Sequence, residues 1–361
     1  MVKLAKKVKQ KSERRAVAEA RERLETVFAE IPFVRLKGSE TDARISGAQV
    51  DLLLNALVSG RPVQFIVGVK AVGEPRLVRV AVEQLKKYLQ GSKDAYGIIV
   101  APYLSDAGRQ ICRDAGIGCA DLAGNAYLSF QSIYIDKSGV PNPFLSTRAA
   151  KSVFSPKSSR ILRVLLAKPS RKWYVEEISK EAGISIGLAS RIKQALLAEE
   201  WIREENKRFS LVNPEDVLKQ WSENHTYTKS QAFSFYSSLS EEELEEAVNR
   251  ECNKRKLRYG LALFSGARKV APFVRFPRFF AYVDGNIDAI AKTLEFKKVE
   301  TGANVTLLVP YDDKGVFYGL RKIGGVDVVS DIQLYLDLKS YGGRGEEAAE
   351  AVFEQGIKSA W

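Results

Sequence analysis

The chain has 361 residues, 45 % of them hydrophobic, a length that allows two or three domains with ordinary apolar cores. An excess of 56 Lys and Arg over 44 Asp and Glu gives a formal net charge of +12. This charge favours an anionic partner, above all nucleic acid. The sequence has no apolar run long enough to cross a bilayer, and its first residues lack the apolar core of a signal peptide. We therefore expect a cytoplasmic protein with no membrane partner.

Histidine and cysteine usage disfavours several kinds of site. Cys112, Cys119 and Cys252 have no C-x-x-C spacing, which fits reduced thiols better than a disulfide framework or a zinc site. The one histidine, His225, lies in a polar stretch where we expect a surface role. Catalysis by a Ser-His-Asp triad and a His-rich metal site are thus disfavoured, and we expect no cofactor.

The first 136 residues divide into a basic segment and a mixed segment. Residues 1–15 hold seven basic residues and one acid, which indicates an arm that adds phosphate contacts or a solubilising tail. A helical apolar stripe then runs to residue 30, so we predict a basic N-terminal helix or arm over residues 1–32. Residues 33–136 alternate between strand and helix patterns and predict an α/β domain with a mixed sheet. Strands are expected at 48–57, 62–71, 96–102, 117–122 and 126–135, and helices at 76–90 and 105–116.

This order of elements is similar to the core of the PD-(D/E)xK nucleases, which implies a restriction-endonuclease-like fold. Such a site has an Asp at the end of one strand and a Glu-x-Lys on the next, so that two carboxylates hold Mg²⁺ while the Lys assists the attacking water. Asp51 and Lys70 occupy suitable positions, but Gly68 stands where the second carboxylate belongs.

Two interpretations of this region remain. Glu83 on the following helix could restore the missing charge, and Gln84 with Tyr88 has the Gln-x-x-x-Tyr spacing of some nuclease branches. Alternatively, Asp51 and Lys70 are an ordinary polar pair in a nuclease-like fold without activity, which is the interpretation we favour. Further on, Gly124-Asn125 signals a turn in which Asp121 could cap or coordinate, and we expect a turn.

Residues 137–157 contain Pro, Gly and Ser breaks without periodicity and predict a linker whose basic side chains could touch DNA. Residues 158–226 then have the order of a winged helix-turn-helix, with helices at 160–168, 175–182 and 185–200. Gly183 supplies the turn between the last two helices. The stretches WIREE and RFSLV predict a hairpin around Asn206-Lys207, which would be the wing, and a further helix follows at 213–224.

The third of these helices would lie in a DNA major groove. Its apolar stripe is expected to bury Ile186, Ala189, Ile192, Leu196 and Leu197. The opposite face is small, polar and basic, which suits base edges and phosphates. The other interpretations are a winged helix that binds protein and the solvated face of a plain helical domain. The residues predicted to bind double-stranded DNA are Ser185, Gly187, Ser190, Arg191, Lys193 and Gln194 on the helix, with Lys207 and Arg208 on the wing.

Residues 227–361 predict a second α/β domain, so the fold class is a multidomain α/β and α+β protein. A capping box at Ser240 opens a helix, and strands are expected at 259–272, 278–285, 303–312 and 315–325 with a helix at 287–296. The stretch SGAR (265–268) lacks the paired acids of a nucleotidyltransferase and the Lys-Ser/Thr of a P-loop, so we expect a turn there. Two helices separated by a glycine break follow at 327–355.

The predicted winged helix and this tail, which reads SDIQLYLDLK (330–339) and GRGEEAAE (343–350), resemble the AbiEi-type antitoxin and transcriptional-regulator family of type IV toxin–antitoxin systems. Residues 121–125 fit longer members, while the nuclease-like region departs from the shortest ones. The resemblance implies binding to inverted repeats in the protein's own promoter, with a nucleotidyltransferase-like toxin as functional partner. We expect the α/β units to be partner or homodimer surfaces. The alternatives are a Mg²⁺-dependent nuclease targeted by the winged helix and a DNA-binding scaffold in a defence or transposition complex.

Overall fold

The computed structural model describes residues 2–45, 47–90, 94–140, 143, 153–271 and 276–361, with the side chains of residues 2–12 and 48 left out of the description. The chain forms two compact units. The first consists of Met1–Thr147 with Ala198–Glu200, and the second of Arg148–Leu197 with Trp201–Trp361. Both units have a mixed α/β architecture, as the sequence predicts at this coarse level. The expected linker at 137–157 lies largely outside the described residues.

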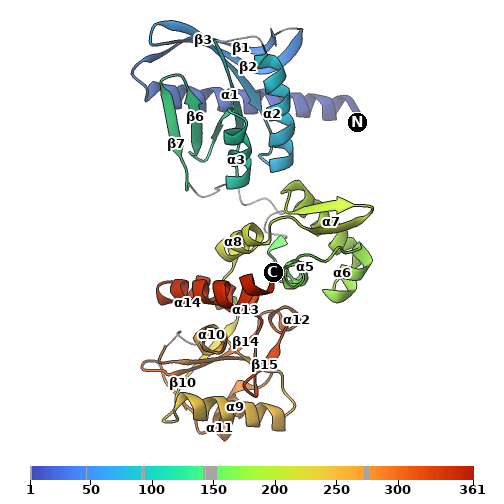
Figure 1. The fold of residues 1–361 in the computed structure, drawn as a ribbon, viewed down its shortest axis with the longest axis vertical. Helices are drawn as coiled ribbons and strands as arrows, with labels where there is room; N and C mark the ends of the chain where they lie inside the picture. The colour runs from blue at the N-terminus through green and yellow to red at the C-terminus, as the bar shows by residue number, and fades with distance from the viewer. Residues whose placement is uncertain (1, 46, 91–93, 141–142, 144–152, 272–275) are drawn as a thin grey trace. The chain divides into compact units, whose positions relative to one another are not determined.

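The first unit is a mixed β-sheet with helices on both faces (Figure 1). Its elements in chain order are α1 (Val2–Ala29), β1 (Val34–Ile45), β2 (Ala48–Val58), β3 (Arg61–Val69), α2 (Pro75–Leu89), β4 (Ala95–Ala101), α3 (Asp106–Asp114), β5 (Gly118–Asp121), β6 (Ala126–Phe130) and β7 (Ile133–Lys137). The strands lie in the sheet in the order in which they occur along the chain. The β3–β4 and β4–β5 pairs are parallel, and the other pairs are antiparallel.

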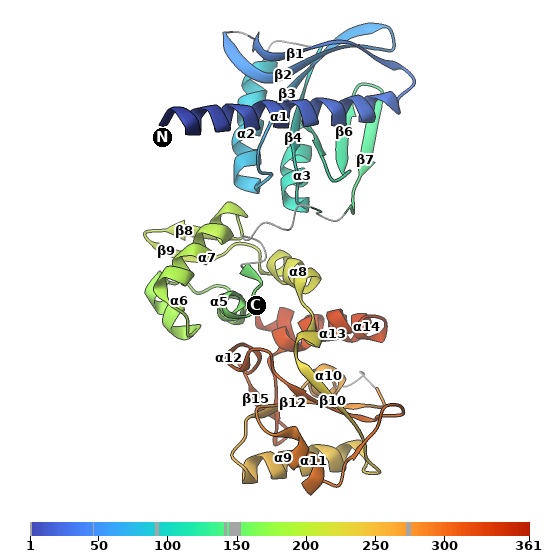
Figure 2. The same cartoon turned by 180° about the vertical axis from the view of Figure 1, so that it is seen from behind.

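Each face of this sheet has its own apolar core. Helix α1 covers one face, where the Phe28 ring stacks on Phe65 with centroids 4.6 Å apart. Helices α2 and α3 cover the other face through Val78, Leu85 and Cys112 (Figures 1 and 2). Because β3 and β4 are buried on both faces, they show up in the sequence as continuous apolar runs.

Two features of the first unit differ from the sequence prediction. Strand β1 was not predicted, because its polar, mostly exposed side chains lack an alternating apolar pattern. The single strand expected at 126–135 is two strands, β6 and β7, joined at Gln131, whose φ is 50°. The backbone of the basic segment is helical from Val2 onwards and continues α1, which is the helix of the two forms, helix or arm, that the sequence analysis left open.

The second unit begins with three helices and a hairpin. Their bounds are α5 (Pro156–Ala167), α6 (Val175–Glu181), α7 (Ile186–Ala198), β8 (Ile202–Glu205) and β9 (Arg208–Leu211). Helix α8 (Pro214–Asn224) and a short 3-10 turn, η1 (Tyr227–Lys229), connect them to a second mixed sheet. An isolated bridge between Trp173 and Phe209 adds a third short segment beside β9.

The second sheet has the strand order β13-β10-β14-β12-β11-β16-β15. Helices α9 and α11 cover one face, and α10, α13 and α14 cover the other (Figures 1 and 2). A single apolar core joins α5, α7 and α8 to this sheet, so no core boundary falls at residue 226. The element bounds are β10 (Gln231–Tyr236), α9 (Glu241–Lys254), β11 (Tyr259–Leu261), α10 (Leu263–Val270), β12 (Phe279–Val283), α11 (Ile287–Thr293), β13 (Lys297–Lys298), β14 (Val305–Val309), α12 (Asp313–Val316), β15 (Arg321–Ile323), β16 (Val326–Val328), α13 (Asp331–Tyr341), α14 (Arg344–Val352), η2 (Phe353–Ile357) and η3 (Lys358–Ala360).

Three sequence predictions for the second sheet are wrong. The strand expected at 259–272 is only β11, and the turn expected at 265–268 lies inside helix α10. Gly266 permits this helix, because an added Cβ would lie 2.8 Å from the Leu261 carbonyl oxygen and 2.5 Å from a Leu334 methyl carbon. Of the strand expected at 315–325, residues 315–316 are the end of helix α12, a turn follows, and only Arg321–Ile323 is strand, as β15. Residues 263–267 of α10 are all buried, so their short run resembles that of a buried strand in the sequence.

His225 is buried, against the surface role that we expected. Its side chain is 3 % exposed, and its Nε2 lies 2.9 Å from Oδ1 of Asp337, which is itself fully buried. The same carboxylate accepts hydrogen bonds from Gln333 Nε2 at 2.7 Å and from the Tyr282 hydroxyl at 3.1 Å. The residue that follows α8 is therefore tied to α13 inside the core.

We predict that Asp337→Ala lowers the free energy of unfolding of the second unit by about 3 kcal/mol, because it leaves buried polar partners without an acceptor. All four tryptophans belong to this unit, so urea denaturation followed by tryptophan fluorescence measures its stability alone. The control is Asp288→Ala at an exposed position of α11. A loss no larger than that of the control would show that the buried carboxylate is dispensable.

Candidate functional site

The turn between α6 and α7 orients α7. Gly183 has a φ of +62°, the left-handed conformation that the sequence predicts for this turn. The Ser185 hydroxyl oxygen then accepts the backbone N–H of Leu188 at 3.3 Å and caps α7. Ala189 and Ile192, each 1 % exposed, anchor one face of the helix in the core. The other face of α7 is therefore turned outward in a fixed direction.

Most of the predicted DNA-binding residues of α7 share this outward face. Ser185, Gly187, Ser190, Arg191 and Gln194 are all exposed, at the spacing of three and four residues that brings side chains together on a helix. Among the described residues, none forms an ion pair or hydrogen bond with the Arg191 side chain. Its guanidinium group is thus available to an external acceptor.

Lys193 does not belong to this face, which corrects the sequence prediction. The residue is 8 % exposed, and its Nζ lies 2.5 Å from Oε1 of Glu204 on β8. The same ammonium group lies 5.6 Å from the centre of the Phe209 ring. Position 193 faces the hairpin because it follows the buried Ile192 around the helix. Lys193 therefore fastens α7 to the hairpin and does not point into solvent.

Ile186 corrects the prediction in the opposite direction. The apolar stripe assigned it to the core, but 54 % of this residue is exposed. Ile186 is the first residue of α7, whereas the first buried residue of this helix is Ala189. Helical spacing places Ile186 on the apolar stripe, and only the position of the helix end decides that this part of the stripe is uncovered.

The hairpin presents cations at its tip. Asn206 and Lys207 have φ values of 50° and 65°, the conformation of the tight two-residue turn that the sequence predicts. Lys207 and Arg208 are exposed, and the Arg208 guanidinium lies 4.5 Å from the centre of the Tyr174 ring. Arg203 is exposed as well, although sequence reasoning did not select it. Its alternation with the buried Ile202 was the signal that could have identified it.

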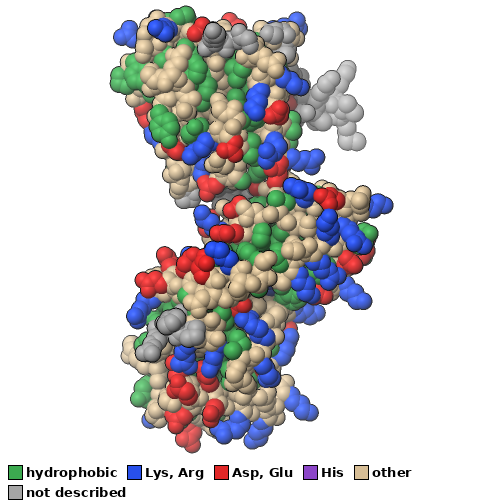
Figure 3. Space-filling view, viewed as in Figure 1, with side chains coloured by type: hydrophobic (Ala, Val, Ile, Leu, Met, Phe, Trp, Pro, Cys, Tyr) green, Lys and Arg blue, Asp and Glu red, His purple; other side chains and the backbone are tan. Residues whose placement is uncertain are grey.

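The acids of the hairpin are paired with local cations. Glu204 bonds Lys193, and Glu205 Oε2 lies 2.7 Å from Lys172 Nζ. The hydrogen bond from Lys172 lowers the pKa of Glu205. These pairs cancel much of the acidic charge beside the tip, so its cations dominate the local field. Figure 3 shows Lys and Arg side chains gathered over the part of the second unit that holds α6, α7 and the hairpin.

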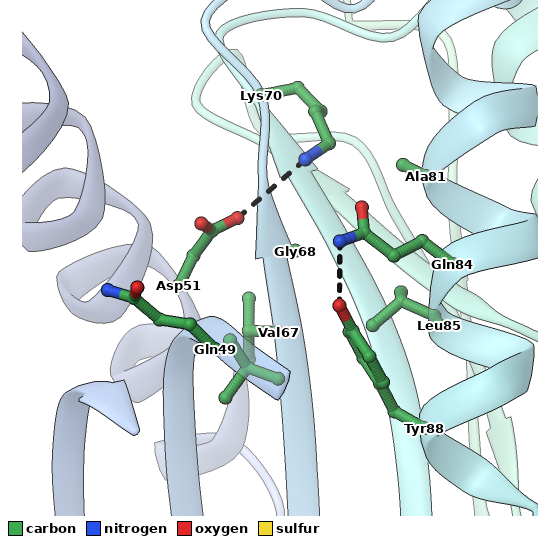
Figure 4. Close-up of a pocket in the computed structure, with 10 residues that line it drawn as sticks. Gln49, Asp51, Val67, Gly68, Lys70, Ala81, Gln84, Leu85 and Tyr88 are labelled. Atoms are coloured by element: carbon green, nitrogen blue, oxygen red, sulfur yellow. Dashed lines mark hydrogen bonds and ion pairs between the residues drawn. The ribbon is translucent and has the colours of Figure 1, made fainter. Parts of the chain in front are cut away.

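The first unit contains a small cavity of about 40 Å³ that is lined by both polar and apolar residues. It holds two of the three predicted catalytic candidates, with Lys70 Nζ 3.7 Å from Asp51 Oδ2 (Figure 4). The same Asp51 oxygen accepts the backbone N–H of Val69 at 2.7 Å. The cavity has room for water but not for a nucleotide. Its lining residues are Gln49, Val50, Asp51, Val67, Gly68, Lys70, Ala81, Gln84, Leu85 and Tyr88.

The third catalytic candidate is not part of this cavity. Glu83 does not line it, and its side chain is 64 % exposed and pairs with Lys86 at 3.3 Å. Gln84 does line the cavity and donates a hydrogen bond to the Tyr88 hydroxyl at 2.7 Å. Among the described lining residues, only Asp51 is acidic. Since Mg²⁺ sites commonly use two carboxylates, Glu83 does not supply the missing one from its observed position.

Gly68 lines this cavity at the position where the sequence analysis expects a second carboxylate in a nuclease site. A Cβ added there would meet only Leu85 side-chain carbons, the nearest at 3.7 Å, which is ordinary van der Waals contact. The position can therefore accept a side chain without displacing the backbone. Within the described part of the chain, no group of three His, Cys, Asp or Glu side chains is arranged to hold a metal ion.

Asp121 has a structural role, which confirms the turn interpretation. It is fully buried, and its Oδ1 accepts the backbone N–H groups of Gly124 and Asn125 at 2.9 and 2.8 Å. Its Oδ2 accepts Leu104 N–H and Asn125 Nδ2. Arg23 of α1 donates to the carbonyl groups of Asp121 and Gly124, both at 2.8 Å. The turn thus ties the end of β5 to α1.

Comparison of the chain with protein-family models, curated proteins and solved structures found no match. No helix in the described part of the chain is long and apolar enough to span a membrane.

The cavity geometry predicts that Gly68→Glu creates a metal site. A glutamate there adds a second carboxylate near Asp51, so we expect Mn²⁺ binding that the wild type lacks at the same concentration, measured by isothermal titration calorimetry. Gly68→Gln is the control, with similar size and no charge. Equal Mn²⁺ binding by both variants would mean that the added charge is not what creates the site.

Proposed function

We propose that the protein is a sequence-specific double-stranded DNA-binding regulator. In this proposal α5, α6 and α7 with the β8–β9 hairpin act as a winged helix-turn-helix, and α7 lies in the major groove. The observation that carries the proposal is the outward face of α7, where Arg191 has no partner among the described residues and is flanked by Gly187, Ser190 and Gln194. Arginine and glutamine are the side chains that read guanine and adenine edges by paired hydrogen bonds.

The hairpin is assigned to the DNA backbone. Arg203, Lys207 and Arg208 are exposed cations beside or at the tip, and the neighbouring acids Glu204 and Glu205 are already paired. Cations at this place would contact phosphates or enter the adjacent minor groove. Because phosphate contacts release counterions, affinity should fall steeply as the salt concentration rises.

The regulatory role follows from the resemblance of the tail. SDIQLYLDLK (330–339) and GRGEEAAE (343–350) support an antitoxin of a type IV system that represses its own promoter. A homodimer would then bind an inverted repeat with half-sites roughly 34 Å or a multiple of that distance apart. A nucleotidyltransferase-like toxin would be the functional partner, and the setting would be the cytoplasm. The scaffold alternative differs only in what the α/β units bind.

For the first unit we propose a restriction-endonuclease-like fold without nuclease activity. The order of strands and helices supports the fold, and the presence of a single carboxylate in the cavity supports the loss of cleavage. The second candidate function, a Mg²⁺-dependent nuclease, is favoured by the closeness of Asp51 to Lys70. Cleavage of supercoiled DNA in Mg²⁺ or Mn²⁺ that disappears in Asp51→Ala would establish it.

We predict that Arg191→Gln lowers the affinity for a duplex selected by the full-length protein from a random DNA library by about five- to 150-fold, since a base contact made by a guanidinium contributes about 1–3 kcal/mol. Fluorescence anisotropy on the labelled duplex measures the change. Lys254→Gln on α9 is the control, an exposed cation away from the outward face of α7. Equal affinity of the Arg191 variant and the wild type would remove α7 from the interface.

A second prediction separates stability from binding at the hairpin tip. Lys207 has a φ of 65°, which favours glycine, so Lys207→Gly should stabilise the second unit by up to about 1 kcal/mol while weakening DNA binding. The slope of log affinity against log salt should become shallower by about one unit. Asn206→Gly relieves a similar φ of 50° without removing charge, so it should leave the salt slope unchanged. Identical salt slopes for both variants would exclude a phosphate contact by Lys207.

A further inference from the structure

Two neighbouring residues at the start of α7, Ile186 and Gly187, are not the residues that would make the folded protein most stable. Ile186 leaves an aliphatic side chain 54 % exposed at the first helical position. Gly187 follows it, and an added Cβ there would meet nothing within 4 Å. Its φ lies outside the left-handed region, so the backbone does not require glycine. An alanine would instead favour the helix by about 0.5–1 kcal/mol.

The two residues have complementary effects at the start of the same helix. Ile186 offers apolar surface to solvent, while Gly187 removes the side chain that would hold another molecule away from the helix backbone. The flanking Ser185 and Ser190 are small, and Arg191 follows on the same face. A base edge that carries a methyl group would suit these features, because it offers an apolar group to Ile186, can approach the helix backbone at Gly187, and has hydrogen-bonding atoms beside the methyl group.

We propose that Ile186 and Gly187 form a seat for the 5-methyl group of a pyrimidine in the major groove. Ile186 makes the apolar contact, and Gly187 allows the base edge to approach α7. In ordinary DNA the major-groove edges carry one apolar substituent, the thymine methyl group. A 5-methylcytosine presents the same group. This inference rests on the proposed DNA-binding function and adds the base chemistry that α7 recognises.

An apolar protein partner fits the observations less well. Surfaces that bind proteins through apolar contact expose patches of several hundred Å². Among the described residues of α7, Ile186 is the only large apolar side chain that is exposed, and its neighbours on the outward face are polar or lack a side chain. The apolar surface that α7 exposes through large side chains is thus limited to Ile186.

The first test uses the full-length protein and duplexes selected from a random library. We expect a thymine at a fixed position, and replacing it with deoxyuridine should lower affinity about fourfold, the effect of one buried methyl group. Ile186→Ala should bind the thymine and deoxyuridine duplexes equally. If cytosine occupies the position, its 5-methylation should raise affinity by a similar factor in the wild type and not in Ile186→Ala.

The second test uses Gly187→Ala. This variant should raise the thermal midpoint of the second unit, followed by tryptophan fluorescence, and lower affinity for the selected duplex about tenfold. Opposite changes in stability and affinity distinguish a contact role from damage to the fold.

The outcomes separate the inference from the function on which it rests. If no duplex is enriched, the proposed function fails and the inference fails with it. If duplexes are enriched but Ile186→Ala retains the wild-type discrimination between methylated and unmethylated pyrimidine, DNA binding stands and the methyl seat is overturned. The methyl seat would also be overturned if Ile186→Ala selected the same duplexes as the wild type and bound them with the same affinity.

Discussion

The ion pair between Arg160 and Asp312 fixes the helix on which the rest of the second unit is arranged. Both side chains are nearly buried, and Arg160 Nε donates to Asp312 Oδ2 at 2.8 Å across 152 residues of sequence. The hydrogen bond to Asp312 raises the pKa of Arg160. Gly315 makes room for the pair, since a Cβ there would lie 2.4 Å from the carboxylate. The attraction within a buried ion pair does little more than compensate for the desolvation of its two charges, so the pair adds little net stability. Its main effect is to fix the position of α5, because in other positions one of the charges would be buried without a partner.

The contacts near α5 are well packed, whereas some exposed residues of α7 and the hairpin are not the ones that favour folding most. Trp361 donates from its indole N–H to the Leu166 carbonyl at 2.8 Å and closes the end of α5. Lys193 and Glu204 join α7 to the hairpin. Beyond these contacts Gly187 weakens a helix and Lys207 adopts a left-handed conformation, both at exposed positions. In the proposal that α7 and the hairpin bind DNA, these local costs lie where the partner makes contact.

In the first unit, we expect the residue at position 68 to decide whether the cavity at Asp51 and Lys70 can hold a divalent cation. Asp51 and Lys70 lie together, and the Asp51 oxygen interacts with the Val69 N–H and the lysine. In the nuclease-like fold that we propose for this unit, Gly68 stands where a second carboxylate would be expected. A single carboxylate paired with an ammonium group has little net charge with which to attract a divalent cation. The cavity nevertheless has room for a side chain at position 68, so the geometry of the surrounding sheet is not what prevents metal binding.

Local patterns in the sequence determined the helices of residues 156–198, the hairpin at Asn206-Lys207 and most strands of the first unit, because periodicity and turn residues act over a few neighbours. The exposed, polar strand β1 has no such signal. Which faces are covered was decided only by tertiary structure: Lys193 is buried by the hairpin, Ile186 is left uncovered at the helix end, and His225 reaches Asp337 across 112 residues. Burial depends on what packs against a residue from elsewhere in the chain, and a local pattern carries no record of that neighbour.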